Sequence, residues 1–455
     1  MQWWDHAAKK LIEQGSCLCR FGFVTTNLVT GSLNRKVIQQ YLDGEEPISL
    51  VFAVPDHPWT KASEQAASVR IAMSVAERGW RKEGTVSRVI SEMNLNTDQP
   101  EIKFEKVTGR IYSNLKTGTN LTNLNRLGSN REVASNGVML AGTDFRVSRT
   151  ERAHYIETDG RNVPIKPYVG GSEIMQLGKD RFVIDLFGMS EKEVRTSFPQ
   201  VYQRLLSTLK ISRKGNIKTY REERWWEFGE NNPLMRQSME GLARFIATTE
   251  TTKHRVFQFL GGDVLPDHMI IAFSFEDAYH LGVLSSTFHE TWAREIASPL
   301  GMATRAQGHR YNKSQIFDTF AFPSATTEHR ATITELAEEL DETRKLVIAE
   351  TPKLTMTELY NLREKLRSGE PLSDKDAKRA SAARAGIVDR LHEQLDQAVA
   401  NAYGWGEEWA AGQLGPSEIV ARLVTLNHER AAEEAEGNIR WLRPDYQISR
   451  FAKKG

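Results

Sequence analysis

Threonine, lysine, histidine and arginine side chains alternate loosely with apolar residues in the segment RFIATTETTKHRVFQF at 244–259. This pattern suits strands and turns that present short polar and cationic groups to phosphates or base edges. A second block, RYNK at 310–313, offers side chains whose donors match guanine and adenine edges in the major groove. Both blocks therefore predict nucleic-acid contact. The predicted contact residues are Lys253, His254, Arg255, Arg310, Tyr311, Asn312 and Lys313.

A basic segment precedes these blocks, with six lysines and arginines between positions 210 and 224. Such clustering can neutralise DNA phosphates, and each contact contributes about −0.9 to the slope of log affinity against log salt concentration. The common alternative is a solvated helix face that binds nothing. Clustering alone leaves both interpretations open, and the candidates for DNA contact are Lys210, Arg213, Lys214, Lys218 and Arg221.

Other polar residues indicate little chemistry. Asp56 and His57 are neighbours in PDHPW and resemble an acid–base pair, but a loop histidine beside proline is more often structural or exposed. Cys17 and Cys19 are one residue apart, so a disulfide between them would be strained and we expect both to stay reduced. No spacing of histidine and cysteine suggests zinc, and we expect no metal site.

Composition limits the class of protein. The 455 residues are enough for about three domains, and 60 lysines and arginines balance 59 aspartates and glutamates. With a net charge of +1, any DNA-binding surface must come from local segregation of charge. No apolar run approaches the roughly 20 residues that cross a bilayer. We expect a soluble, cytoplasmic protein without membrane contact.

The elements before residue 80 follow a defined order. A helix is predicted over 3–14, a strand at CRFGFVTTN, a helix over 34–42, and strands at ISLVFAVPD and SVRIAMSVAE. This order is that of the closing half of an open α/β sheet. Residues 80–110 are polar and rich in turn formers, which predicts a linker.

The remaining chain predicts two further fold types. Residues 111–325 combine loops and short strands with a helix whose start carries Ser190 and, three residues later, Glu193, a capping box. From 326 to 455, apolar residues recur at helical spacing with charges on the other faces. The predicted fold is multidomain: α/β, then mixed α+β, then a C-terminal helical bundle.

Several blocks closely resemble one family, the MmeI-like DNA adenine methyltransferases of type IIL restriction-modification systems. RWWEFGE, RFIATTETTKHRVFQF, AYHLGVLSS and RYNKSQIFDTFAFP are similar, in this order, to the family's target-recognition domain. FGFVTTN, VFAVPDHPW and VRIAMSV resemble the last three strands of its class I catalytic domain. The resemblance implies a partial Rossmann-like methyltransferase sheet over 1–79, a target-recognition domain over 111–325 and a helical domain over 326–455.

The resemblance also implies roles for single residues. Adenine methyltransferases take the target base out of the duplex, and a flipped base needs an aromatic face on which to stack. Trp59 is the candidate for that face, although it could equally plug the edge of the sheet. Thr26 and Asn27 lie where open α/β sheets place ligand contacts, so a role near the target nucleotide is implied, but strand-end residues of these types also cap helices.

The family's cofactor elements do not occur in this sequence. We find no glycine-rich turn for S-adenosyl-L-methionine, no Asn-Pro-Pro-aromatic tetrad and no nuclease signature. We therefore assign no cofactor-binding residue and expect a separately encoded N-terminal half to supply the cofactor site and the tetrad. With double-stranded DNA as substrate, the expected activity of the assembled pair is site-specific N6-adenine methylation, and the chain alone is expected to be inactive.

Two alternatives stay open. The chain could be an inactive fragment, or a stand-alone DNA-binding specificity protein without catalysis. Blocks that match the family pattern suit phosphate contact or scaffolding better than base reading, because such residues are shared by enzymes with different targets. Specificity is expected in less family-like loops, for example 263–268 or 298–309.

Overall fold

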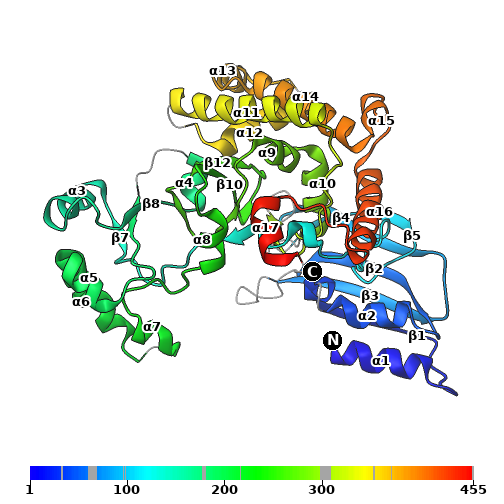
Figure 1. Cartoon of the computed structure of the whole chain (residues 1–455). Coiled ribbons are helices and arrows are strands. Elements are labelled where there is room, and N and C mark those ends of the chain that lie inside the picture. The colour runs from blue at the N-terminus through cyan, green and yellow to red at the C-terminus, as the bar shows by residue number, and fades with distance from the viewer. Residues whose placement is uncertain are drawn as a thin grey trace. The chain divides into compact units, whose positions relative to one another are not determined.

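The computed structural model of the chain is a mixed α/β structure with several small sheets and many helices (Figure 1). It divides into two compact units, the first formed by residues 1–125, 298–309 and 415–429, and the second by residues 126–297, 310–414 and 430–455. The structure describes residues 1–31, 34–59, 69–95, 97, 99–176, 181–215, 217–297, 309–351, 354–369 and 371–452.

The first unit is built on a five-stranded sheet with the order β1-β3-β2-β4-β5. Its elements are α1 (Gln2–Ile12), β1 (Arg20–Thr26), η1 (Asn27–Thr30), α2 (Arg35–Leu42), β2 (Ile48–Pro58), β3 (Arg70–Arg78), β4 (Gly84–Met93) and β5 (Glu101–Gly109). Strand β3 pairs antiparallel with both β1 and β2, so β1 and β2 run parallel to each other on either side of it. Strand β4 pairs parallel with β2 and antiparallel with β5.

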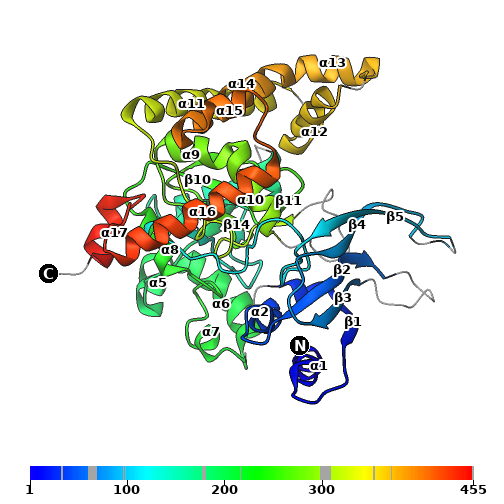
Figure 2. The same cartoon turned by 90° about the vertical axis from the view of Figure 1, so that its right-hand side faces the viewer.

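Helices α1 and α2 lie side by side against one face of this sheet (Figure 2). Trp4 and Leu11 of α1 are buried in the same core as Ala53 and Ala72, whose small side chains let the helices approach the strands. Nε1 of Trp4 also donates to the hydroxyl of Ser74 at 3.3 Å. The helices and strands predicted before residue 80 are confirmed.

The prediction of a linker over 80–110 is wrong. These residues form the hairpin of β4 and β5, whose register runs from Gly84 opposite Gly109 to Met93 opposite Glu101. Strand β2 pairs with β4 only at Thr85 and Val86. Because most of the hairpin therefore lies beyond β2 and stays exposed, its strands lack the apolar alternation that reveals a strand in a sequence.

The second unit contains two four-stranded sheets, with the orders β12-β10-β14-β6 and β13-β8-β9-β7. Phe145, Leu205 and Trp225 belong to a core beside the second sheet, and Phe245 and Ile270 to a core beside the first. Up to residue 310 the elements are η2 (Gly128–Asn130), β6 (Ala134–Asn136), β7 (Arg146–Val147), α3 (Arg149–Thr158), β8 (Ile165–Val169), α4 (Gly171–Gln176), β9 (Phe182–Ile184), α5 (Glu191–Ser197), α6 (Pro199–Arg213), α7 (Thr219–Glu223), α8 (Pro233–Met239), β10 (Arg244–Thr249), β11 (Thr251–Thr252), β12 (Gln258–Gly261), β13 (Leu265–Pro266), β14 (Ile270–Phe273), α9 (Ala278–Ser285), α10 (Thr287–Ile296) and β15 (His309–Arg310).

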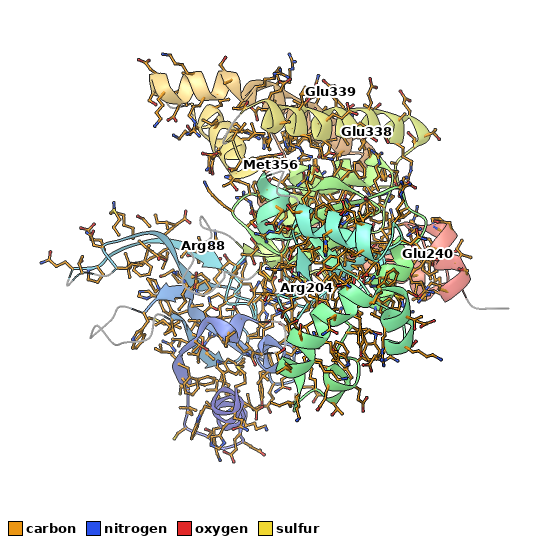
Figure 3. All side chains as sticks on the ribbon, turned by 90° about the vertical axis from the view of Figure 1, so that its left-hand side faces the viewer. Arg88, Arg204, Glu240, Glu338, Glu339 and Met356 are labelled. Atoms are coloured by element: carbon orange, nitrogen blue, oxygen red, sulfur yellow. The ribbon has the colours of Figure 1, made fainter. Side chains whose placement is uncertain are left out.

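Helices α5 and α6 have clear local causes. The predicted capping box of Ser190 and Glu193 is confirmed at the start of α5, where it satisfies two free backbone N–H groups. Helix α6 buries one residue in every four along a single stripe that ends at Arg213. On another side of α6, Arg204 (labelled in Figure 3) bonds to Glu151 at 2.6 Å and so fastens α6 to α3.

Helices follow Pro323, as predicted: α11 (Thr327–Glu350), α12 (Met356–Arg367), α13 (Asp374–Ala382), α14 (Ala385–Tyr403), α15 (Gly406–Ala410), α16 (Pro416–Ala435) and α17 (Pro444–Phe451). Helix α11 packs against α9 and α14 (Figure 1). At Gly282 of α9, a side-chain carbon would lie 2.5 Å from Ile333, so glycine is needed for this approach. The predicted domain boundaries do not coincide with the two units, since part of α16 belongs to the first.

Candidate nucleic-acid interface

A network of charged and polar side chains lies at the carboxyl ends of β1 and β2. A β-bulge in β2 between Val54 and His57 contains Asp56. Arg70 donates through Nε to Oδ1 of Asp56 at 2.5 Å and through Nη2 to Oε1 of Glu92 at 2.6 Å. Burial would lower the pKa of the Arg70 guanidinium, but its hydrogen bonds to Glu92 and Asp56 raise it, so this cation stays charged.

The network holds one of the residues predicted to lie near a target nucleotide. Nδ2 of Asn27 donates to Oδ1 of Asp56 at 2.9 Å. Thr26 precedes Asn27, is exposed, and pairs with Ile71 of β3. The structure therefore brings Asn27 to the charged network and leaves Thr26 at the same end of β1.

Trp59 directly follows the last residue of β2, and its side chain is 47% exposed. Its backbone N–H donates to the carbonyl of Val69 at 3.0 Å, which extends the pairing of β2 with β3. An exposed indole on an anchored strand end has the geometry to stack on an unpaired base.

His57 and Asp56 form no acid–base pair. The His57 ring stacks on Phe104 of β5 with 5.7 Å between ring centroids, and its Nδ1 lies 2.7 Å from the carbonyl of Pro58. The Asp56 oxygen that is bonded serves Arg70 and Asn27. These contacts support the interpretation of His57 as a structural residue.

The basic segment of α6 and α7 is largely exposed. Lys210 lies 3.4 Å from Glu191 and its ammonium stands 5.0 Å from the centre of the Trp225 ring. Lys214 is exposed at the end of α6, and Lys218 is exposed with Glu230 at 3.2 Å. Ion pairs of this kind at the surface are weak and exchange readily for phosphate. These three lysines are therefore accessible to the phosphate backbone of DNA.

Arg213 differs from its neighbours because it is only 3% exposed. Its guanidinium donates to the carbonyls of Trp225, Glu227, Leu140 and Ala141, and it lies over the Phe145 ring. A phosphate could reach it only by breaking this set of bonds. Arg213 therefore stabilises the fold, and the prediction that it contacts DNA is wrong. Arg221 is partly buried and bonds to the carbonyl of Gly229 at 3.4 Å.

The block at 253–255 turns mostly inward. Lys253 bonds to Asn361 at 2.7 Å and Glu364 at 3.0 Å, and buried His254 shares Asn361 at 2.8 Å. The buried guanidinium of Arg255 donates to the carbonyl of Thr249, and burial lowers its pKa to about 10. His254 and Arg255 therefore hold the fold, contrary to their predicted DNA contact.

The RYNK block divides between surface and core. Arg310 is exposed and pairs with Glu250 at 2.6 Å, whereas Tyr311 is fully buried and bonds to His289 at 3.0 Å. Burial raises the pKa of the Tyr311 hydroxyl well above its usual value, so Tyr311 is a neutral core residue and no DNA contact. Asn312 is exposed, but its side-chain oxygen accepts hydrogen bonds from the backbone N–H and the hydroxyl of Ser314. Lys313 is half-buried.

Of the two loops expected to carry specificity, only 263–268 lies wholly among the described residues; 298–308 lies outside them. Leu265 and Pro266 are buried and pair with β8. Asp267 accepts the hydroxyl of Tyr168 and lies 3.0 Å from His268. In this loop Asp263 is exposed and His268 is partly exposed.

The sequence reasoning missed Arg70 and Glu92. A signal for Arg70 exists, because an arginine within the apolar run VRIAMSV predicts a buried cation that needs an acidic partner. No comparable signal marks Glu92, which lies in the segment that was expected to be a linker.

Comparison with known proteins agrees with this description. Residues 125–324 match the family model for the MmeI target recognition domain. The whole chain is similar in fold to the type IIL restriction-modification enzyme MmeI in complex with DNA, with a TM-score of 0.69 and 18% identity over 94% of this chain and 52% of that one. The resemblance predicted from the sequence is confirmed.

Other comparisons add little. The type IIG restriction endonuclease BpuSI aligns with 87% of this chain and 48% of its own at 10% identity, but a TM-score of 0.28 carries no argument. No curated protein matches the chain. Among the described residues, no helix is long and apolar enough to cross a membrane, and no group of three or more histidine, cysteine, aspartate or glutamate side chains could hold a metal ion. The chain spans about half the length of MmeI.

Proposed function

We propose that this chain is the DNA-recognition and partial catalytic portion of a site-specific DNA N6-adenine methyltransferase in a type IIL restriction-modification system. The observation that carries this proposal is a target recognition domain over 125–324 within a chain whose fold follows MmeI almost throughout. In this proposal a separately encoded half supplies the S-adenosyl-L-methionine site and the Asn-Pro-Pro-aromatic tetrad; we find neither signature in the residues of this sequence.

The first unit supplies the end of a Rossmann-like catalytic sheet in this proposal. The parallel strands β1 and β2 flank the antiparallel β3, and α1 and α2 cover one face, as expected for a piece of an open α/β sheet. Trp59 then stacks on the flipped adenine, with Thr26 and Asn27 beside the target nucleotide. Helices α11–α14 form the C-terminal bundle.

In the second unit, the residues proposed to contact phosphate are the predicted cations that lie at the surface. These are Lys210, Lys214, Lys218, Arg221, Lys253, Arg310 and Lys313, with Asn312 beside them. Each of them is at least partly exposed, which supports this choice over the buried cations.

The experiment is to purify the tagged chain from its host and identify what is recovered with it. A stoichiometric protein with the cofactor turn and the tetrad is expected, and the pair should transfer a radiolabelled methyl group from S-adenosyl-L-methionine to adenine in DNA. The chain alone should bind DNA without methylating it. Sequence-selective binding with no companion and no methylation would instead identify a stand-alone specificity protein, and an aggregated chain would identify a fragment.

The same pair tests Trp59. Trp59→Ala should weaken the stacked state of the base by about 1 to 3 kcal/mol, because an indole face is lost. The measurement is the fluorescence of 2-aminopurine placed at the target position, together with turnover. If neither changes, Trp59 does not hold the base.

A further inference from the structure

Arg70 forms a buried ion cluster whose composition is unusual for the interior of a sheet. Its side chain is 4% exposed, and its two carboxylate partners, Asp56 and Glu92, are 28% and 7% exposed. Nη1 adds a second bond to Glu92 at 3.2 Å, so one guanidinium serves both acids. Removing charged groups from water is costly, and apolar residues of similar size often stabilise such a position equally well. The cluster therefore calls for a role beyond stability.

The three members of the ion cluster lie on different strands. Asp56 belongs to the bulge of β2, Glu92 to β4, and Arg70 itself begins β3 opposite Pro58. Strands β2 and β4 pair directly only at two positions, so the ion cluster fastens their ends where backbone pairing has stopped. Bulges of this kind re-aim side chains and are common beside active sites.

Two groups of the candidate site depend on this fastening. Asn27 is bonded to the same Asp56 oxygen that Arg70 holds. Trp59 follows Pro58, and its N–H bonds to Val69, the residue before Arg70. A shift of Arg70 would therefore move both of them.

We propose that Arg70 is a positioning residue, which acts through Asp56 and Glu92 to fix Asn27 and Trp59 at the ends of β1 and β2. This inference rests on the proposed function for its purpose, since Asn27 and Trp59 would then face the flipped base. The guanidinium itself is enclosed by its two carboxylates and is only 4% exposed. Arginine is required because its planar fork bonds to two carboxylates at once, which lysine cannot reproduce.

The first test measures backbone hydrogen exchange in the full chain. In Arg70→Met, the amide of Trp59 and the peptide around Asn27 should exchange at least tenfold faster, while peptides of α1 stay unchanged. Arg70→Lys should give an intermediate rate. The matched control is Arg78→Met on the same strand, which removes an exposed pair with Glu46 at 3.1 Å and should leave the Trp59 amide unchanged.

If Arg70→Met does not fold, Glu92→Gln provides the milder change, because it keeps the shape of the side chain and removes one charge. Faster exchange at Trp59 in Glu92→Gln supports the inference. Exchange as slow as in the wild type, in a folded Arg70→Met or in Glu92→Gln, overturns it.

The second test uses the assembled pair on its target duplex. Glu92→Gln should lower kcat at least tenfold and reduce the 2-aminopurine signal, with DNA affinity within twofold of the wild type. A purely structural role would lower the amount of folded protein without this division between kcat and affinity. If the wild-type pair does not methylate, the proposed function fails while the exchange result still decides the role of Arg70. If it methylates and Glu92→Gln keeps full kcat, the positioning role fails alone.

Discussion

The basic residues of α6–α7 and those beside β10 are similar in sequence but lie in opposite environments. In α6–α7, Lys210 and Lys218 are exposed and pair at the surface with Glu191 and Glu230. Beside β10, His254 and Arg255 are buried and bond to neutral oxygens of the protein. A cluster of cations thus marks a DNA surface only where the chain leaves those cations outside.

Arg213 shows how narrow the difference is. It lies within the basic segment, yet it continues the buried stripe of Val201, Leu205 and Leu209 at intervals of four residues. Helical periodicity therefore turns one cation of α6 inward while Lys210 and Lys214 stay outside. The environment is set by position on the helix, and the residue type alone does not reveal it.

Replacing Arg213 should have the largest effect. Arg213→Met removes the hydrogen bonds to four carbonyls, of which, among the described residues, only that of Leu140 keeps another donor, the N–H of Gly229. We therefore expect a loss of roughly 3 to 5 kcal/mol in the free energy of unfolding. Urea unfolding followed by circular dichroism measures it. Lys214→Met, one residue further along, is the matched control and should cost less than about 0.5 kcal/mol. Equal costs for the two variants would contradict the scaffold role.

Acid should destabilise the region beside β10 through His289. Burial lowers the pKa of His289 from 6.5 to about 3, although the hydrogen bond between Nδ1 and the carbonyl of Leu284 at 3.0 Å acts in the opposite direction. The unfolded chain therefore binds a proton between pH 6.5 and pH 3 that the folded chain does not. Stability contributed by neutral His289 is full above pH 6.5 and falls as the pH drops towards 3, by roughly 3 to 5 kcal/mol in total.

The measurement is the free energy of unfolding as a function of pH. His289→Gln keeps a hydrogen-bonding side chain that does not titrate, so its stability should vary less steeply over this window than that of the wild type. His6, which is exposed on α1, is the control position, and His6→Gln should leave the slope unchanged. A slope that His289→Gln does not alter would exclude a buried neutral histidine.

Much of the fold could be predicted from periodicity. The capping box at Ser190, the helices after Pro323 and the strands before residue 80 all have local signals, and the structure contains them. The hairpin of β4 and β5 could not be found in this way, because β5 is largely exposed and β4 is buried mainly at its start, so neither strand carries a clear apolar alternation. The pairing of strands and the bulge at Asp56 depend on contacts distant in sequence.

The candidate site could be predicted only in part. Trp59 and Asn27 were found through a family resemblance, and Lys210, Lys214 and Lys218 through clustering. Tyr311 and Arg255 were misjudged because each is buried against a residue distant in sequence: Arg255 lies over the Tyr311 ring, and Tyr311 also packs against Phe257. The ion cluster of Arg70 joins residues from three strands, so no spacing of residues in the sequence predicts it.

Neutralising the exposed lysines should have a moderate effect that appears in DNA binding and not in folding. In the triple variant Lys210→Gln, Lys214→Gln and Lys218→Gln, the slope of log affinity against log salt should become shallower by about 2 to 3, because each phosphate contact contributes about −0.9. The preferred DNA sequence should not change. The control variant Lys375→Gln, Lys378→Gln and Arg390→Gln removes the same charge from exposed positions of α13 and α14 and should keep the wild-type slope. An unaltered slope in the first variant would remove α6–α7 from the interface.

Lys253 gives the smallest and most discriminating effect, since it lies beside the buried block but is itself partly exposed. Its ammonium is bonded to Glu364 at 3.0 Å, and this hydrogen bond lowers the pKa of that carboxyl. Because the charge is already balanced by Glu364, Lys253→Gln should change the free energy of unfolding by less than about 1 kcal/mol. The salt slope should shift by less than the 0.9 or so of a full phosphate contact. Glu364→Gln removes the acidic partner of Lys253. If DNA lies close to Lys253, this variant should steepen the slope of log affinity against log salt. If Lys253→Gln made the salt slope shallower by about 0.9 or more, Lys253 would instead contact phosphate as the lysines of α6–α7 are proposed to do.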